Sequence, residues 1–408
     1  MLQVKTPQEF LDIVNERFEP VLPKEDVALE QALGRILYED IIAKEYVPGF
    51  DRSSVDGYAV LAEDTFGCGT AMPALLQLHG QVLMGSSAPC DISPGQCQYV
   101  PTGGALPKGA DAVVMLEYCE DYGDGTIGVL KAAAPGNNIV YRGDDVYPGK
   151  KVIAAGKKLA AHDIGALAAL GIITVPVRRQ LRVGIISTGD ELVPPNQDPG
   201  PGQVRNINSL LLCAEMSQQG ALARDYGIIR DDEKQLAKAL EAAVAENDLV
   251  LISGGSSVGV KDATERVIAA SGELLVHGLA VKPGKPTLLG IVEGKPVVGL
   301  PGHPGAAFFI TRQFVRILTD RLSARKRREY LIPAVLDEKV GANHGRAQYT
   351  TVSLEQRDDG IHAVPRRAKS SQISDLAAAD GCFCIPCDQE GAMAGETVWV
   401  SLYDAGDN

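Results

Sequence analysis

Long apolar runs are missing from this sequence. No clean run of about 18 or more apolar residues occurs in the 408-residue chain, and the first ten residues, MLQVKTPQEF, contain no apolar signal segment. The eight cysteines are scattered along the chain. We therefore expect a cytoplasmic protein that spans no membrane and keeps its thiols reduced.

Positive charge is also scarce. Lys and Arg together number 39 against 52 Asp and Glu, which gives a formal net charge of -13. Such a surface repels polyphosphate backbones and anionic lipids, so it argues against general binding of nucleic acid or membranes. A small anionic ligand fits this charge only where local cations, backbone N–H groups or a metal ion reverse the field.

The composition that remains is that of a globular protein. Hydrophobic residues make up 45% of the chain and charged residues 22%, which excludes disorder and coiled coil as overall descriptions. The length predicts about two to four domains. The 44 glycines and 24 prolines exceed the usual share and predict many turns and backbone-lined loops.

The amino-terminal part carries helical signals. Thr6-Pro7-Gln8-Glu9 is typical of a helix capping box, with Pro at the first helical position. Leu29, Leu33, Ile36 and Leu37 have helical spacing and predict a second helix. A further helical pattern covers Asp163–Leu170.

Between these helical signals the pattern changes to short strands. Residues 47–140 carry apolar runs broken by Gly, Pro and Asp, with Gly123-Asp124-Gly125 as a hairpin turn. We therefore predict a β-rich domain over 47–140. It would be inserted into a split helical and β segment made of residues 1–46 and 141–177.

The rest of the chain predicts two more domains. The apolar strands LRVGIIST, DLVLIS and PVVGL alternate with helical patterns at Asn208–Gln219, Glu233–Glu246 and Asp262–Ala270. This alternation predicts a parallel, doubly wound α/β domain over 178–326. Short strands, with a turn at Asp358-Asp359-Gly360, predict a small all-β domain over 327–408. The fold class is thus multidomain α/β plus β.

Two of the predicted strands end in unusual loops. In doubly wound sheets, ligands bind beyond the carboxyl ends of the strands. One strand runs into Ser187-Thr188-Gly189-Asp190-Glu191, and another into the Gly-rich segment Ser253–Gly259. The second loop resembles a phosphate cradle, in which backbone N–H groups and a helix dipole bind an oxyanion. Either loop could equally be a tight turn.

Carboxylates gather at the same predicted edge. Asp190, Glu191, Asp231, Asp232 and Asp262 lie at or after strand ends. Beside an anion cradle such charge is electrostatically reasonable if Mg²⁺ bridges the carboxylates to the ligand. The alternative is helix capping, because Asp231, Asp232 and Asp262 each precede a helix, and we expect capping for at least one of them.

Two further loops place cations or rigid backbone at strand ends. Lys282-Pro283-Gly284-Lys285-Pro286 holds two cations in a stiff turn, and Gly299–Gly305 opens a helix. Their Pro and Gly residues favour a shaped anion contact over a solvated lysine pair.

The group Cys382, Cys384 and Cys387 could suggest a metal site. These cysteines lack a fourth ligand at zinc spacing, so we expect strand residues there.

The order of the motifs is more specific than any one of them. It runs Phe50–Ala59, Pro101–Gly104, Arg142–Asp145, Ser187–Glu191, Ile229–Asp232, Ser253–Gly259, Lys282–Pro286 and Gly299–Pro304. Along essentially the whole chain, this series resembles the molybdopterin molybdenumtransferase family, which includes the carboxyl-terminal domain of gephyrin. The resemblance implies an elongated subunit in a homodimer, with a central molybdopterin-binding α/β domain and a carboxyl-terminal β-barrel.

The resemblance also implies a reaction. Family members insert molybdenum from molybdate into adenylylated molybdopterin with a divalent cation, here Mg²⁺, and release AMP and molybdenum cofactor. Tungstate could replace molybdate, because the two oxyanions have nearly the same size and charge. Two alternatives stay open. One is a molybdopterin adenylyltransferase-like protein, disfavoured because that activity needs neither the Asp56 region nor the barrel, and the other is a non-catalytic or dual-role scaffold.

Family position, together with the loops described above, gives the candidate site. The catalytic residues implied are Asp56, Asp145, Asp231 and Asp262, and the metal ligands implied are Glu191 and Asp262. We expect Asp56 and Asp145 near the dithiolene and the incoming oxyanion, and we expect a site shared by two subunits. The substrate-binding candidates are Thr102, Ser187, Gly189, Asp190, Gly254, Gly255, Ser256, Lys282, Lys285, Pro301, Pro304 and Ser371.

The sequence departs from the family pattern at three positions. Gly278, His303 and Thr351 stand where many members have Lys, Asn and Arg, whereas Arg346 is retained. Two cations are thereby lost. Either the affinity for an anionic substrate falls or other groups supply the positive charge.

Overall fold

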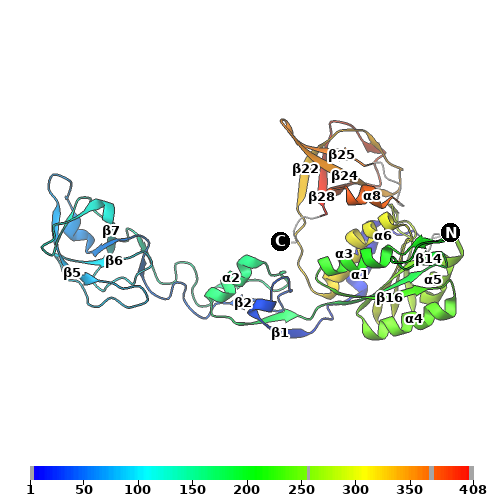
Figure 1. The fold of residues 1–408 in the computed structure, drawn as a ribbon, viewed down its shortest axis with the longest axis horizontal. Coiled ribbons are helices and arrows are strands. Elements are labelled where there is room, and N and C mark those ends of the chain that lie inside the picture. The colour runs from blue at the N-terminus through cyan, green and yellow to red at the C-terminus, as the bar shows by residue number, and fades with distance from the viewer. Residues whose placement is uncertain (1–3, 255–257, 367–371, 404–408) are drawn as a thin grey trace. The chain divides into compact units, whose positions relative to one another are not determined.

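The chain folds into two compact units (Figure 1). The computed structural model describes residues 4–254, 258–366 and 372–403, with the backbone alone for 258–262. The first unit comprises Met1–Glu39, Ala155–Ala161 and Thr174–Asn408, and the second comprises Asp40–Ala154 and His162–Ile173. Each unit has a hydrophobic core of its own, and each is described separately.

The predicted capping box opens the first helix. Thr6 Oγ1 accepts the Glu9 N–H at 3.2 Å, and the Glu9 carboxylate accepts the Thr6 N–H at 2.8 Å. This reciprocal pair satisfies two backbone donors that the first turn of a helix leaves without partners. The helix, α1 (Pro7–Arg17), then buries Phe10 and Val14 in the core of the first unit.

The second predicted helix is absent from this part of the chain, so that expectation is wrong. Strand β1 (Lys24–Ala28) leads into a single 3₁₀ turn, Leu29–Gln31, and the chain then becomes extended. Leu33 is 61% exposed, and Gly34 has φ +74°, a value that interrupts a helix. Strand β1 pairs with β12 (Thr174–Arg178), and the predicted helix residues Ile36 and Leu37 form β-bridges with Lys158 and Val177, so tertiary pairing outweighs the local helical spacing.

The β-rich part is an insertion, as predicted. The outgoing strands β2 (Ile41–Ile42) and β3 (Arg52–Ser53) pair with the returning strands β11 (Lys151–Ile153) and β10 (Ile139–Val140). The chain therefore leaves and returns along paired strands. The predicted helix near residue 163 is α2 (Ala161–Ala169). The domain boundaries proposed from the sequence stay predictions.

The insertion contains a six-stranded sheet in the order β7-β4-β6-β5-β9-β8. The turn at Gly123-Asp124-Gly125 joins β8 and β9 as an antiparallel hairpin, and both glycines have positive φ, as predicted. The strands are β4 (Gly57–Val60), β5 (Ala74–Gln81), β6 (Gln96–Val100), β7 (Ala112–Met115), β8 (Cys119–Asp121) and β9 (Thr126–Val129).

The first unit is built on a six-stranded sheet in the order β16-β13-β17-β21-β20-β18. The doubly wound α/β class is confirmed, but β20 runs antiparallel to both of its neighbours, β21 and β18, so the expectation of a wholly parallel sheet is wrong. The two-residue turn Glu293-Gly294 has positive φ at both positions, which joins neighbouring strands as a hairpin. The strands are β13 (Arg182–Thr188), β16 (Leu222–Ile229), β17 (Leu249–Gly254), β18 (Glu273–His277), β20 (Leu288–Val292) and β21 (Lys295–Leu300).

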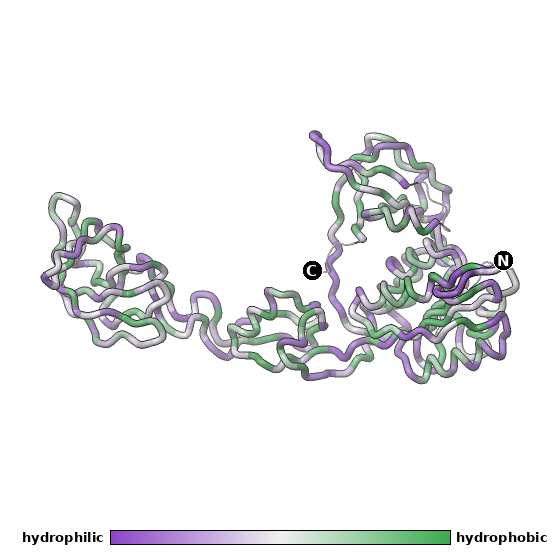
Figure 2. Tube along the Cα trace, in the orientation of Figure 1, coloured by the Kyte–Doolittle hydropathy of each residue, from purple (hydrophilic) through white to green (hydrophobic). Residues whose placement is uncertain are grey.

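Helices cover both faces of this sheet, because alternate residues of its strands point in opposite directions. On β13, Ile185 lies in the core shared with α1 and α3, whereas Ile186 lies in the core shared with α4. Figure 2 shows the apolar strands at the centre of these layers. The helices are α3 (Asn208–Gln218), α4 (Glu233–Glu246), α5 (Val258–Ser271), α6 (Pro304–Ile310) and α7 (Arg316–Leu322).

The last part of the chain is a β-barrel. The pairings run β24-β25-β22-β28-β26 and return from β26 to β24, so the barrel closes on itself. Its interior contains Leu336, Val352, Phe383 and Val400. The strands are β22 (Leu331–Leu336), β24 (Ala347–Arg357), β25 (Gly360–Pro365), β26 (Gly381–Ile385) and β28 (Thr397–Leu402). None of the helices described is long and apolar enough to cross a membrane.

Candidate functional site

A large cleft in the first unit is lined by cations. It has a volume of about 860 Å³, and its walls come from loops of the α/β sheet and from the barrel. The described residues that line it include no Asp or Glu. In a chain with a net charge of -13, this is a local reversal of the field. Its positively charged residues are Lys282, Lys285, Lys339, Arg346 and Arg366.

The loop that carries the two predicted lysines is held rigidly. Gly284 has φ +117°, and an added Cβ there would lie 2.4 Å from Ile310 Cδ1, so only glycine fits. The Thr287 hydroxyl donates to the Gly284 carbonyl at 2.7 Å. Short strand β19 (Val281–Lys282) pairs with β24 and places Lys282 beside the barrel. The shaped lysine turn predicted from the sequence therefore forms one wall of the cleft.

The Gly299–Gly305 segment contributes to the same cleft. Pro301 and His303 line it, and Pro304 is the first residue of α6. Of the three positions that depart from the family pattern, His303 and Thr351 line the cleft. Gly278 has φ +100°, a backbone conformation that favours glycine. Lys339 and Arg366, which the sequence did not single out, add cations from the barrel side.

The carboxyl ends of β13 and β17 present polar groups. Ser187 is fully buried, and its hydroxyl donates to Asn206 Oδ1 at 3.3 Å, so this side chain supports the loop. Asn208 Nδ2 donates to Ser253 Oγ at 2.7 Å and to the Gly302 carbonyl at 2.8 Å. Gly254 ends β17 at the same edge.

Two buried oxygens at this edge have no hydrogen-bond partner among the residues that the structure describes. They are Thr188 Oγ1 and Asn208 Oδ1, on residues that are 1% and 7% exposed. A buried polar atom without a partner is costly, and a ligand group would satisfy it. The sequence does not single out either side chain, because Thr188 is one residue of a loop motif and Asn208 is the first residue of a predicted helix.

The predicted carboxylates do gather. Asp190 Oδ1 accepts the Asp231 N–H at 3.4 Å. Partial burial raises the pKa of Asp231, and the neighbouring charges of Asp190 and Glu191 raise it further. Gly189 has φ +150°, and a Cβ there would lie 2.7 Å from the Glu191 carboxylate, so Glu191 is folded against the loop. Asp190 and Glu191 thus place negative charge beside the Asp231 carboxylate at one end of the sheet.

Capping explains one of the other acidic residues. Asp232 is the N-cap of α4, and its side chain accepts the Gln235 N–H at 2.9 Å. The expectation that at least one of the aspartates caps a helix is therefore confirmed. Asp231 is not the N-cap, and its backbone N–H donates to Asp190 Oδ1.

The carboxylates fit Mg²⁺ only with help from a ligand. Among the described residues, no group of three His, Cys, Asp or Glu side chains could hold a metal ion. Mg²⁺ commonly binds through one or two carboxylates together with substrate phosphates. Three mutually repelling carboxylates at the end of a sheet suit that arrangement, because a shared divalent cation would relieve the repulsion.

Some predicted residues lie outside the described part of the chain. These are Gly255, Ser256 and Ser371. Asp262 lies within α5, but its side chain is not among those described. The cysteine group behaves as predicted in one respect, since Cys382 and Cys384 are residues of strand β26, while Cys387 follows that strand.

The insertion brings two predicted residues together. Asp56 Oδ1 accepts the Thr102 N–H at 2.9 Å, so the PTGG turn rests on this carboxylate. The Asp145 N–H donates to the Val47 carbonyl at 3.1 Å, and the Asp145 carbonyl accepts the Lys150 ammonium. Asp56, Thr102 and Asp145 all belong to the second unit, whereas the cleft and the sheet edge belong to the first.

The sequence matches three family profiles in succession. They are described as "MoeA N-terminal region (domain I and II)" over residues 5–171, "Probable molybdopterin binding domain" over 184–321 and "MoeA C-terminal region (domain IV)" over 333–403. Together these matches follow the predicted order of parts.

Several known proteins are similar over nearly their full length. Molybdopterin molybdenumtransferase of Haemophilus influenzae is 35% identical over 380 residues, covering 92% of this chain and 93% of that protein. Molybdopterin molybdenumtransferase 2 of Mycobacterium tuberculosis is 32% identical over 413 residues, covering 97% and 99%. The crystal structure of a molybdopterin biosynthesis MoeA protein from Pyrococcus horikoshii aligns with a TM-score of 0.88 and 33% identity, covering 98% of this chain and 100% of that chain.

Proposed function

The chain belongs to the molybdopterin molybdenumtransferase family and is a transferase of molybdenum cofactor biosynthesis, and from this premise we propose the following reaction. It transfers molybdenum from molybdate to adenylylated molybdopterin, with Mg²⁺, and releases AMP. The observation that carries this proposal is the cationic cleft of about 860 Å³. It offers room and positive charge for an anionic substrate in an otherwise acidic protein.

The cleft supports binding of the oxyanion and of the charged part of molybdopterin. Lys282 and Lys285 project from a loop that Gly284 and Thr287 hold in place, and Arg346 faces them from the barrel wall. Charge-assisted hydrogen bonds from such groups are the strongest that a protein can offer an oxyanion. Tungstate would meet the same groups.

The sheet edge supports binding of the phosphate that leaves with AMP. Thr188 and Asn208 offer oxygens that have no partner in the described part of the chain, and the backbone of the Gly-rich loop would supply N–H donors. Glu191 and Asp262 would hold Mg²⁺. Asp190 precedes Glu191 in the sequence, and its carboxylate accepts the Asp231 N–H. When bound, the ion would neutralise the charge that builds on the leaving phosphate.

The residues of the insertion would complete the site across a homodimer. Asp56 and Thr102 form one rigid turn, yet they belong to a unit packed separately from the cleft. A two-fold dimer would place the insertion of one chain over the cleft of the other and create two equivalent sites. Asp56 and Asp145 would then act from one subunit and Asp262 from the other.

Release of AMP tests the reaction directly. Purified protein is incubated with adenylylated molybdopterin, and AMP is followed with and without molybdate and Mg²⁺. We expect AMP only when both are present. AMP formation undiminished in excess chelator would contradict the metal role, and no AMP under any condition would favour a scaffold.

Mixing variants tests the shared site. Asp56→Ala and Asp262→Ala chains, each nearly inactive alone, are unfolded and refolded together. About half of the dimers are then mixed and have one intact site of two, so roughly a quarter of the wild-type activity should return. No recovery, with mixed dimers shown to form, would place the whole site within one chain.

A further inference from the structure

The two walls of the cationic cleft belong to separately packed layers. Lys282 and Lys285 extend from loops of the α/β sheet, whereas Lys339 and Arg346 belong to the barrel. The sheet and the barrel have distinct hydrophobic cores. The spacing of the cations across the cleft therefore depends on what holds the barrel against the sheet.

The covalent connection between the layers does not hold them by itself. Helix α7 ends at Leu322 and β22 begins at Leu331, and residues 323–330 between them form no regular element. Figure 2 shows this connection as a hydrophilic stretch of chain. The barrel is held instead by the short pairing of β19 with β24, by an apolar cluster of Phe308, Phe309 and Tyr403, and by polar side-chain contacts.

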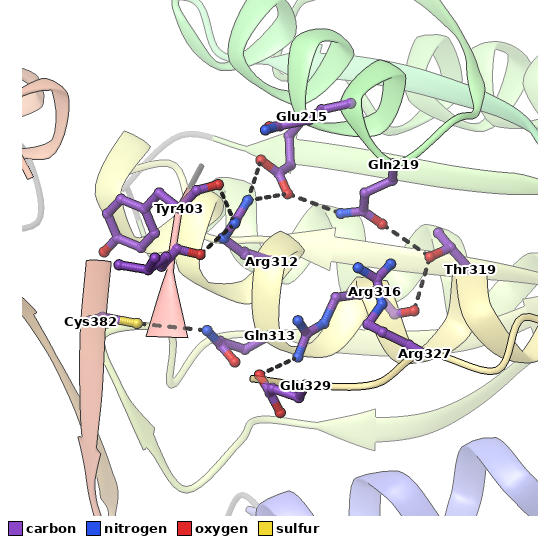
Figure 3. Close-up of polar contacts among 12 residues, drawn as sticks. Glu215, Gln219, Arg312, Gln313, Arg316, Thr319, Arg327, Glu329, Cys382 and Tyr403 are labelled. Carbon is purple, nitrogen blue, oxygen red and sulfur yellow. Dashed lines mark hydrogen bonds and ion pairs between the residues drawn. The ribbon is translucent and has the colours of Figure 1, made fainter. Parts of the chain in front are cut away.

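Arg312 makes a charged contact that crosses from one layer to the other, and its neighbour Gln313 adds a weaker one to Cys382 (Figure 3). Its Nη2 donates to the Leu402 carbonyl at 2.9 Å and also to the Tyr403 carbonyl, at the end of the last barrel strand. Its Nη1 lies 3.4 Å from both carboxylate oxygens of Glu215 on α3. One guanidinium thus joins a helix of the α/β layer to the barrel.

This contact is buried and held in place. The side chains of Glu215 and Arg312 are 4% and 14% exposed, so water screens their attraction little. Gln219 donates to Glu215 at 3.0 Å and accepts from Thr319 at 3.0 Å, which fixes the carboxylate. A lysine could not replace this geometry, because only a planar guanidinium reaches two carbonyls and a carboxylate together.

The segment that carries Arg312 is also connected to the wall of the cleft through Tyr403. Arg312 lies in the π-helical turn Thr311–Val315 between α6 and α7, and turns of this kind are rare and frequently occur at functional sites. Its guanidinium lies 5.5 Å from the centre of the Tyr403 ring. Tyr403 packs against Phe309, which lines the cleft. A change at Arg312 is therefore passed on to the cleft wall.

We propose that Arg312 is a positioning residue that sets the spacing between the two cationic walls of the cleft. The proposal rests on the proposed function, because it assigns Arg312 to the binding of the anionic substrate. Arg312 does not touch the substrate itself. It acts through the barrel, whose position decides whether Arg346 and Lys282 reach the same ligand.

Lysine substitution of Arg312 is the first test. Arg312→Lys keeps the positive charge but loses the planar guanidinium that contacts Glu215 and the two carbonyls together. We therefore expect the KM for molybdate to rise about tenfold while kcat changes less than about twofold. The matched control is Arg321→Lys on the same helical segment. Arg321 makes similar contacts to the Phe18 and Asn15 carbonyls, away from the barrel, and should leave both constants unchanged.

A second variant separates positioning from stability. Arg312→Met with Glu215→Gln removes both buried charges, so no carboxylate is left without its partner. We expect this double variant to fold with a near wild-type melting temperature and still show the raised KM. A normal KM in the folded double variant would overturn the proposal.

Hydrogen exchange provides a measurement that needs no substrate. The Ala347 N–H donates to the Ala280 carbonyl where the barrel meets the lysine loop. In Arg312→Lys, amides of 280–285 and 347–351 should exchange faster, while amides of β13 and β17 keep their protection. Faster exchange throughout the sheet, or none at this junction, would contradict the proposal. If the wild-type protein releases no AMP, the proposed reaction fails, whereas the exchange result still decides the role of Arg312.

Discussion

Two regions of the first unit that handle negative charge are built in opposite ways. The cleft gathers five cations and no carboxylate among its described lining residues. The nearby end of the sheet gathers Asp190, Glu191 and Asp231, and their mutual repulsion contributes to the raised pKa of Asp231. An oxyanion can bind directly in the first region, but in the second it needs a cation of its own.

The difference teaches that net charge is a poor guide to one site. At -13, the chain as a whole repels anions, and this charge led us to expect no general affinity for phosphate polymers. The structure nevertheless brings five cations, from the α/β layer and from the barrel, to the lining of one cleft. Substrate selectivity in this protein is thus a matter of local placement.

The largest effect is expected from removing positive charge from the cleft. Lys282→Met with Lys285→Met deletes two charge-assisted contacts from the cleft, and we expect kcat/KM for AMP release to fall about a hundredfold or more. The matched control is Lys234→Met with Lys238→Met on the exposed side of α4. That pair lowers the net charge equally and should change kcat/KM less than about twofold. Equal losses in both pairs would mean that long-range charge, and not the cleft, attracts the substrate.

A smaller effect is expected from the acidic side. Asp231→Asn removes one of the three repelling carboxylates, so we expect about a tenfold loss of activity and a higher Mg²⁺ requirement. Because the folded-state pKa of Asp231 is raised, its ionised form opposes folding at neutral pH, and the variant should melt slightly higher than wild type.

The neighbouring aspartate provides the control for this substitution. Asp232→Asn keeps an N-cap of equal quality on α4 and should leave activity, Mg²⁺ requirement and melting temperature unchanged. A lower melting temperature for Asp231→Asn would show that this carboxylate stabilises the fold, contrary to the account above.

The smallest effect concerns the barrel, outside both regions. The hydrogen bond to Asp337 raises the pKa of His362, with further support from Asp359 and against the charge of Arg357. A raised pKa contributes stability that is complete below the unfolded-state value and is lost as pH rises through the folded-state value. Wild type should therefore exceed His362→Gln in urea midpoint by more at about pH 5.5 than at about pH 9.

The chain offers a local probe for this measurement. Trp399, its one tryptophan, lies on barrel strand β28, so tryptophan fluorescence reports unfolding of the barrel. A difference between the two proteins that stays constant over this pH range would contradict the assignment of the effect to His362.

Local signals in the sequence predicted local structure well. The capping box at Thr6 and the turn at Gly123-Asp124-Gly125 are specified by neighbouring residues, and both are present. The helix predicted from the spacing of Leu29, Leu33, Ile36 and Leu37 is absent, because Ile36 and Leu37 form β-bridges with residues more than a hundred positions away. The reversed direction of β20, which runs antiparallel to β21 and β18, was missed for a similar reason, since strand direction depends on a partner.

The candidate site shows the same division. The Ser187–Glu191 and Lys282–Pro286 motifs were visible as motifs, and the structure places them at the sheet edge and in the cleft. Lys339 and Arg366 could not be predicted, because they are separate cations of the barrel that become significant only across a cavity. Asn208 was hidden in a helix start, and only its unsatisfied buried oxygen distinguishes it.

Calorimetric titration of molybdate, compared with AMP release, tests the central comparison most directly. Molybdate is titrated into the protein in Mg²⁺ and again in excess chelator, and AMP release is measured under the same two conditions. We expect the same affinity for molybdate in both conditions, because the cationic cleft needs no metal, while AMP release stops in chelator. Loss of molybdate binding in chelator would contradict it, since the oxyanion would then depend on the metal and not on the cleft.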